Sequence, residues 1–68
     1  MVNSKRIKER MEELGLRQGD IAEALNLARP TVSQKINNVR PMDLEEAEIL
    51  QRKLHIPDSE FGAYFFGG

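Results

Sequence analysis

One stretch of 21 residues, from Gln18 to Asn38, constrains the fold of this chain more than any other segment. Its sequence, QGDIAEALNLARPTVSQKINN, has apolar residues at helical spacing on both sides of a break at residues 26–28. These apolar residues are Ile21, Ala22 and Leu25 before the break, and Val32 and Ile36 after it. The pattern predicts two short helices joined by a tight turn, the second with a polar face turned outward.

Three residues of this segment have the sizes that such a pair of helices needs. Ala22 is small enough to let the two helices approach each other, Leu27 is the apolar residue in the turn, and Val32 is a branched anchor in the second helix. Two helices arranged in this way form a helix-turn-helix unit, which we expect at about residues 18–37. In that motif the second helix enters the major groove of DNA.

An ordered set of motifs along the chain resembles the phage-repressor-like helix-turn-helix family, the XRE-type class that includes lambda repressor and Cro. The set consists of LGLRQGDIAEALNLARPTVSQKINNVR, an acidic-capped helix after it, and HIPDSEFGAYFF, and it spans Ile7 to about Phe66. The resemblance implies an all-α, compact five-helix domain of the lambda-repressor type. It also implies a sequence-specific, Cro-like phage repressor that binds double-stranded operator half-sites through the major groove.

Periodicity and capping residues predict the ends of five helices. The expected ranges are 4–14, 18–25, 29–37, 43–54 and a short helix after residue 57. Ser4 is the expected N-cap of the first helix, and Gly15 and Asn38 are expected in the left-handed conformation that ends a helix. Asp43 and Glu46 have the spacing of a capping box. The fourth-helix side chains expected in the core are those of Leu44, Ala47, Leu50 and Leu54.

The length and composition limit what else the chain can do. Its 68 residues suffice for one domain, which we expect to span residues 1–68 and to end in a disordered Gly67 and Gly68. The absence of cysteine excludes disulfides and thiolate metal sites. No apolar run is long enough to cross a bilayer, and no secretory signal begins the sequence. We expect a cytoplasmic protein, in a bacterial host cell or its nucleoid, with no membrane partner.

Charge is divided unevenly between the two parts of the chain. Residues 1–40 hold eight basic and five acidic residues, whereas residues 41–68 hold two basic and six acidic ones. Such polarity suits a small domain with one side facing phosphates and the other turned away from them. Ordinary scatter of surface charge explains the same division equally well.

The predicted third helix carries the side chains expected to contact DNA bases. Gln34 can pair with adenine and Arg29 with guanine through two hydrogen bonds each. Pro30 can offer only an apolar contact, for example to a thymine methyl group. Thr31 and Ser33 suit a base edge or a phosphate, and Thr31 alternatively a hydrogen bond within the first turn. The complete base-contacting set that we expect is Arg29, Pro30, Thr31, Ser33 and Gln34.

A second set of side chains is expected to contact the phosphate backbone. The resemblance implies this role for Gln18, at a helix start where exposed N–H groups favour an anion. It implies the same role for residues that follow the third helix. The complete phosphate-contacting set that we expect is Arg17, Gln18, Lys35, Asn37, Asn38 and Arg40. For Lys35 and Arg40 the alternative is a solvated charge without a partner.

Aromatic residues gather at the end of the chain, at Phe61, Tyr64, Phe65 and Phe66. Some of them are expected to close the core against the first and fourth helices. The others are candidates for a dimer interface, because one module contacts few base pairs and symmetric dimers on half-sites about 34 Å apart are the usual solution. We therefore expect a homodimer, at least on DNA.

No residue pattern indicates catalysis, a metal or another cofactor. His55 is the only histidine, and we expect it at a helix C-terminus, interacting with free carbonyls. Glu45, Glu46 and Glu48 are expected on a helix surface without partners for acid-base chemistry. The rival function is a protein-interaction module, such as a phage antirepressor that binds another phage regulator instead of DNA. The acidic second part of the chain and the aromatic residues would suit that role.

Overall fold

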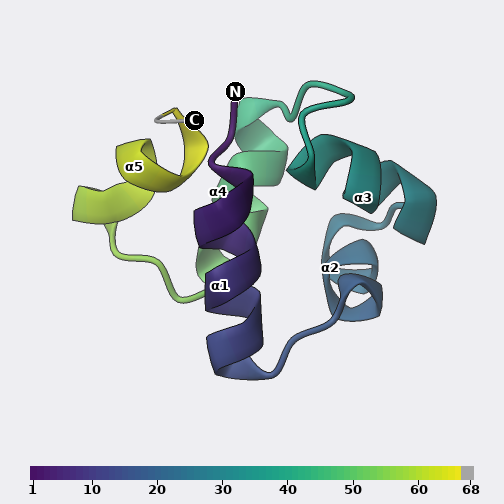
Figure 1. Cartoon of the computed structure of the whole chain (residues 1–68), viewed down its shortest axis with the longest axis horizontal. Coiled ribbons are helices and arrows are strands. Elements are labelled where there is room, and N and C mark those ends of the chain that lie inside the picture. Colours follow the sequence, from purple (N-terminus) through teal and green to yellow (C-terminus); the bar gives the residue numbers. More distant parts are fainter. Residues whose placement is uncertain (67–68) are drawn as a thin grey trace.

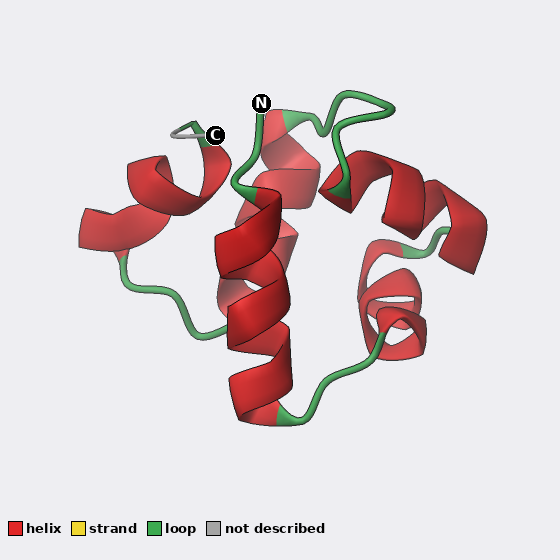
Figure 2. Cartoon of the chain, viewed as in Figure 1, coloured by secondary structure: helices red, strands yellow, loops and turns green. Residues whose placement is uncertain are grey.

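Five α-helices and one short 3-10 turn form the secondary structure of residues 1–66, the part of the chain that the computed structural model describes (Figures 1 and 2). The elements are α1 (Ser4–Leu14), α2 (Gln18–Leu25), α3 (Arg29–Ile36), α4 (Leu44–Lys53), η1 (Asp58–Glu60) and α5 (Phe61–Phe65). The predicted all-α, five-helix fold is confirmed. Gly67 and Gly68, predicted to be a disordered end, lie outside the described residues.

The core joins apolar stripes from all five helices. Its most deeply buried side chains are those of Ile7, Ile21, Val32, Ile36, Leu50 and Leu54. Burying one such side chain stabilises the fold by roughly 1.5–3 kcal/mol, so these residues decide how the helices pack. α2 packs against both α3 and α4, and α1 packs against α5. In Figure 1, α2 and α3 therefore form one side of the molecule and α5 the other.

Local signals end the helices where the sequence predicted. Gly15 and Asn38 have φ angles of 68° and 62°, the left-handed conformation expected of them. Pro30 lies in the first turn of α3, where its missing N–H leaves no helical hydrogen bond unmade. The capping box of α4 is present: Glu46 N–H donates to Asp43 Oδ1 at 2.8 Å, and Asp43 N–H donates to Glu46 Oε1 at 3.0 Å.

Two predictions about side chains are wrong. The N-cap of α1 is Asn3, whose Oδ1 accepts a hydrogen bond from Arg6 N–H at 3.2 Å, whereas Ser4 Oγ donates to the Ile36 carbonyl. Leu44 is 61% exposed rather than buried. At 100° per residue it lies about 90° around α4 from the centre of the buried stripe, and it is the first residue of that helix.

The described helices are short or polar. None of those within residues 1–66 combines the length and the hydropathy that crossing a membrane requires.

Candidate nucleic-acid interface

α3 presents one polar flank to solvent because its opposite flank is fixed in the core. Val32 and Ile36 are fully buried and anchor the helix. Arg29 and Pro30 are exposed at its start, and Thr31, Ser33 and Gln34 are half-buried along it. All five residues predicted to contact bases thus belong to one eight-residue helix at the edge of the molecule, and none of them lies in the core (Figure 1).

The backbone carbonyl and the side-chain amide of Gln34 differ in their hydrogen bonds. The backbone carbonyl accepts hydrogen bonds from Val39 N–H at 2.8 Å and Arg40 N–H at 3.1 Å, which folds the following loop against the end of α3. Its side-chain amide makes no hydrogen bond to any residue in the described range 1–66. The donor and the acceptor of that amide are therefore available to a ligand.

The start of α2 leaves backbone donors exposed beside polar side chains. Arg17 and Gln18 are both exposed, and Gln18 is the first residue of the helix. Asp20 turns its carboxylate back to accept Arg17 N–H at 2.8 Å, so it stabilises this end of the helix. The N–H groups of Gln18 and Gly19 have no backbone partner within residues 1–66. An anion would be stabilised at this point.

The amides of Asn37 and Asn38, two residues expected to contact phosphates, form hydrogen bonds within the molecule. Asn38 Oδ1 accepts from Val2 N–H at 2.9 Å, and its Nδ2 donates to the Val2 carbonyl at 3.0 Å. Asn37 Oδ1 accepts from Lys8 Nζ at 2.5 Å, and its Nδ2 donates to the Ser33 carbonyl at 2.8 Å. The two residues hold the amino-terminal segment against the end of α3.

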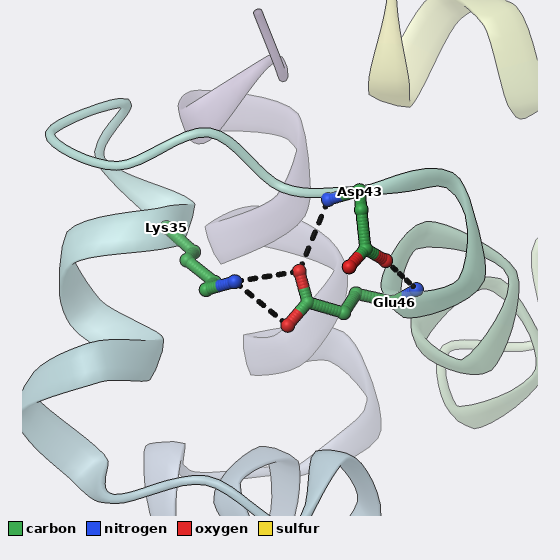
Figure 3. Close-up of polar contacts among 3 residues, drawn as sticks. All are labelled: Lys35, Asp43 and Glu46. Atoms are coloured by element: carbon green, nitrogen blue, oxygen red, sulfur yellow. Dashed lines mark hydrogen bonds and ion pairs between the residues drawn. The ribbon is translucent and has the colours of Figure 1, made fainter.

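Lys35 is not the unpaired surface charge that was the alternative to a phosphate contact. Its Nζ lies 2.6 and 2.7 Å from the two carboxylate oxygens of Glu46, and each side chain is only 15% exposed (Figure 3). Glu46 also completes the predicted capping box with Asp43. The pair ties α3 to the start of α4. Arg40, by contrast, is exposed and forms no ion pair within residues 1–66.

The terminal aromatic residues have unequal surroundings. Phe65 is 3% exposed and belongs to the core, so its expected place in a dimer interface is wrong. Phe61 and Tyr64 are half-buried against the same core, and Phe66 is 70% exposed. The Phe66 ring centroid lies 5.7 Å from that of Phe61, so these two rings form one continuous aromatic surface.

His55 lies just after the end of α4, as expected. Its φ is a left-handed 54°, and its backbone N–H donates to the Arg52 carbonyl at 3.2 Å. Arg10 binds the next two carbonyls, with Nε donating to Leu54 O at 2.8 Å and Nη2 to His55 O at 3.3 Å. No cluster of His, Asp or Glu side chains in the described part of the chain has the geometry to hold a metal ion.

Local sequence patterns could have revealed some of these contacts and not others. Lys35 lies about 80° around α3 from its buried stripe, so a partner on a neighbouring helix was foreseeable. The contact between Asn38 and Val2 joins residues 36 positions apart, which no local pattern shows. Gly19 was also missed, although a glycine in the first turn of a helix is itself a signal of close packing.

Comparison with known proteins gives one match. The chain matches the family model described as Helix-turn-helix over residues 7–61, from α1 to the start of α5. No curated protein and no solved structure matches it significantly.

Proposed function

The chain belongs to the XRE-type helix-turn-helix family of DNA-binding transcription regulators, and on this premise we propose that it is a Cro-like phage repressor. In this proposal α3 enters the major groove of an operator half-site. The observation that carries the proposal is the outer flank of α3, which is polar, solvent-facing and held rigidly by two buried residues. The major groove is about 12 Å wide and admits such a helix.

The contacts divide into two groups by their place on the molecule. Pro30, Thr31, Ser33 and Gln34 face the bases in this arrangement, and Gln34 has the strongest case because its amide is unpartnered within residues 1–66. The phosphates on either side of the groove meet the two ends of the motif. The residues proposed there are Arg17, Gln18 and Arg40, all of them exposed. Lys35 is not among these residues, because its charge is paired with Glu46.

We further propose that two copies bind together on DNA, in the cytoplasm of a bacterial host. One domain with few phosphate contacts binds weakly, and a symmetric dimer doubles those contacts. The surface that supports this proposal is the aromatic one formed by Phe61 and Phe66. Tyr64 is the other partly exposed aromatic residue of α5.

Binding to DNA is expected to depend steeply on salt. If each domain neutralises about four phosphates, affinity for a mixed-sequence duplex falls about 100-fold between about 50 and 200 mM salt. Fluorescence anisotropy with a labelled 20-base-pair duplex measures this directly. Absence of binding at both salt concentrations contradicts the proposal. Selection of bound sites from random DNA then gives the operator, and two-fold symmetry in those sites reports a dimer.

Replacing Gln34 with alanine is expected to relax sequence preference, whereas replacing Gln18 with alanine should weaken binding to all duplexes alike. The loss of one bidentate base contact costs about 1–3 kcal/mol on the preferred site, or roughly 5- to 150-fold, and little on mixed DNA. Competition between the selected site and mixed duplex separates the two effects. Identical behaviour of the two variants would refute the division of roles.

A protein-interaction role remains the second candidate function. It is favoured by the exposure of three large apolar side chains, Val39, Leu44 and Phe66, which a protein partner such as another phage regulator could cover. Under this alternative, DNA binding is absent at low and moderate salt, which the titration above distinguishes.

A further inference from the structure

The Arg29 guanidinium lies against the backbone of α2 at Gly19. A Cβ atom added to Gly19 would lie 2.8 Å from Arg29 Nη2, 3.1 Å from Cζ and 3.2 Å from Nε. The guanidinium therefore occupies the space that a side chain at position 19 would take. Arg29 begins α3, so this contact links the first turns of the two helices of the motif.

Nothing in the backbone explains why residue 19 is glycine. Gly15 is the only glycine of residues 1–66 with a positive φ, so Gly19 does not need the conformational freedom that glycine alone has. Glycine destabilises a helix relative to alanine. The close approach of Arg29 is thus the feature of Gly19 that alanine could not reproduce.

The Arg29 guanidinium that lies against Gly19 can still donate hydrogen bonds to a ligand. Arg29 forms no ion pair within 4 Å in the described range, and it is exposed. The nearest acidic group of the first turn, Asp20, is directed to Arg17 N–H instead. The surface hollow that Arg29 lines also includes Arg17 and Gln18, two of the residues proposed to contact phosphate. The acidic Asp20 and Glu23 line it as well, but neither forms an ion pair with Arg29.

We infer that Gly19 is a positioning residue that directs Arg29 to a phosphate of the DNA backbone, and not to guanine as the sequence suggested. The inference rests on the proposed function and deepens it. A guanidinium held at α2 lies beside the phosphate-contacting end of the motif, away from the flank of α3 where Gln34 is free.

The test compares Gly19→Ala with Gly62→Ala, each in the native chain and in the Arg29→Ala variant. Gly62 is the matched control, because it lies in a helix and an added Cβ meets no atom within 4 Å. Affinities for the selected site and for a mixed duplex are measured at several salt concentrations. Thermal unfolding of each variant shows whether the fold is retained. We expect it to be retained, because the three atoms nearest to the methyl group that Gly19→Ala adds all belong to the flexible end of the Arg29 side chain.

Gly19→Ala is expected to weaken binding to both duplexes by the same factor, about fivefold near 150 mM salt, and to reduce the salt slope by about one. Gly19→Ala should have no further effect on affinity in the Arg29→Ala variant. Gly62 lies in α5, between aromatic residues proposed for the dimer, so Gly62→Ala should change affinity by the same factor in both backgrounds. An equal effect of Gly19→Ala in both backgrounds overturns the inference, since it would not act through Arg29. A loss of affinity confined to the selected site also overturns the inference, because it would make Arg29 a base contact. The inference is likewise overturned if Gly19→Ala causes no loss of affinity.

The same experiment separates this inference from the proposed function. If the native chain binds neither duplex at any salt concentration, the proposed function fails and the inference fails with it. If the native chain binds with a steep salt dependence and Gly19→Ala binds equally well, only the inference fails.

Discussion

Replacing Ile36 with alanine is expected to lower the free energy of unfolding by about 3 kcal/mol. Ile36 is 1% exposed, so the substitution leaves a cavity between α3 and the rest of the core. In a domain this small, that loss lowers the melting temperature by about 15 °C. Urea unfolding followed by circular dichroism measures the change, and DNA binding should weaken in proportion to the unfolded fraction.

Val39 provides the matched control for Ile36. It is an aliphatic residue in the loop after the same helix, but it is 71% exposed. Val39→Ala should therefore change the free energy of unfolding by no more than about 0.5 kcal/mol. Equal destabilisation by the two substitutions would show that α3 is not packed as described.

Replacing Lys35 with methionine is expected to lower the free energy of unfolding by about 2 kcal/mol. The substitution leaves the Glu46 carboxylate, only 15% exposed, without its cationic partner. Glu46→Gln in the same protein should recover part of the loss, because it removes the unpaired charge and keeps an acceptor for Asp43 N–H. Urea unfolding of both single variants and the double variant gives the coupling energy.

The more exposed ion pair of Arg10 and Glu13 provides a reference for the coupling energy between Lys35 and Glu46. Arg10 and Glu13 are 3.6 Å apart, and the Glu13 side chain is 65% exposed, so Glu13→Gln should cost less than about 0.5 kcal/mol. If the coupling energy between Lys35 and Glu46 is also below about 0.5 kcal/mol, the pair does not have the structural role described. If Lys35 instead contacted a phosphate, Lys35→Met would leave stability unchanged and reduce the salt slope of DNA binding by about one.

The helix ends could be predicted from sequence because each depends on a few neighbouring residues. Gly15 ends α1 and the Asp43–Glu46 box starts α4 through contacts that span one turn. The same is true of Pro30 in the first turn of α3. Spacing alone was also enough to assign Val32 and Ile36 to the core.

The remaining features depend on residues that are distant in sequence. Periodicity placed Lys35 off the buried stripe but could not supply Glu46 as its partner on another helix. Phe65 and Phe66 are adjacent and chemically identical, yet one is in the core and the other in solvent, because only the packing of α5 distinguishes them. The direction of Arg29 depended on the absence of a side chain at Gly19, on the neighbouring helix.

The paired hydrogen bonds between Asn38 and Val2 close a ring of chain that contains α1, α2 and α3. Release of the first residues and loosening of the exit from α3 are therefore one event rather than two. Amide protons at those two places should exchange with solvent together, although 36 positions separate them in sequence. The geometry of the helix proposed to enter the groove is thus tied to the second residue of the chain.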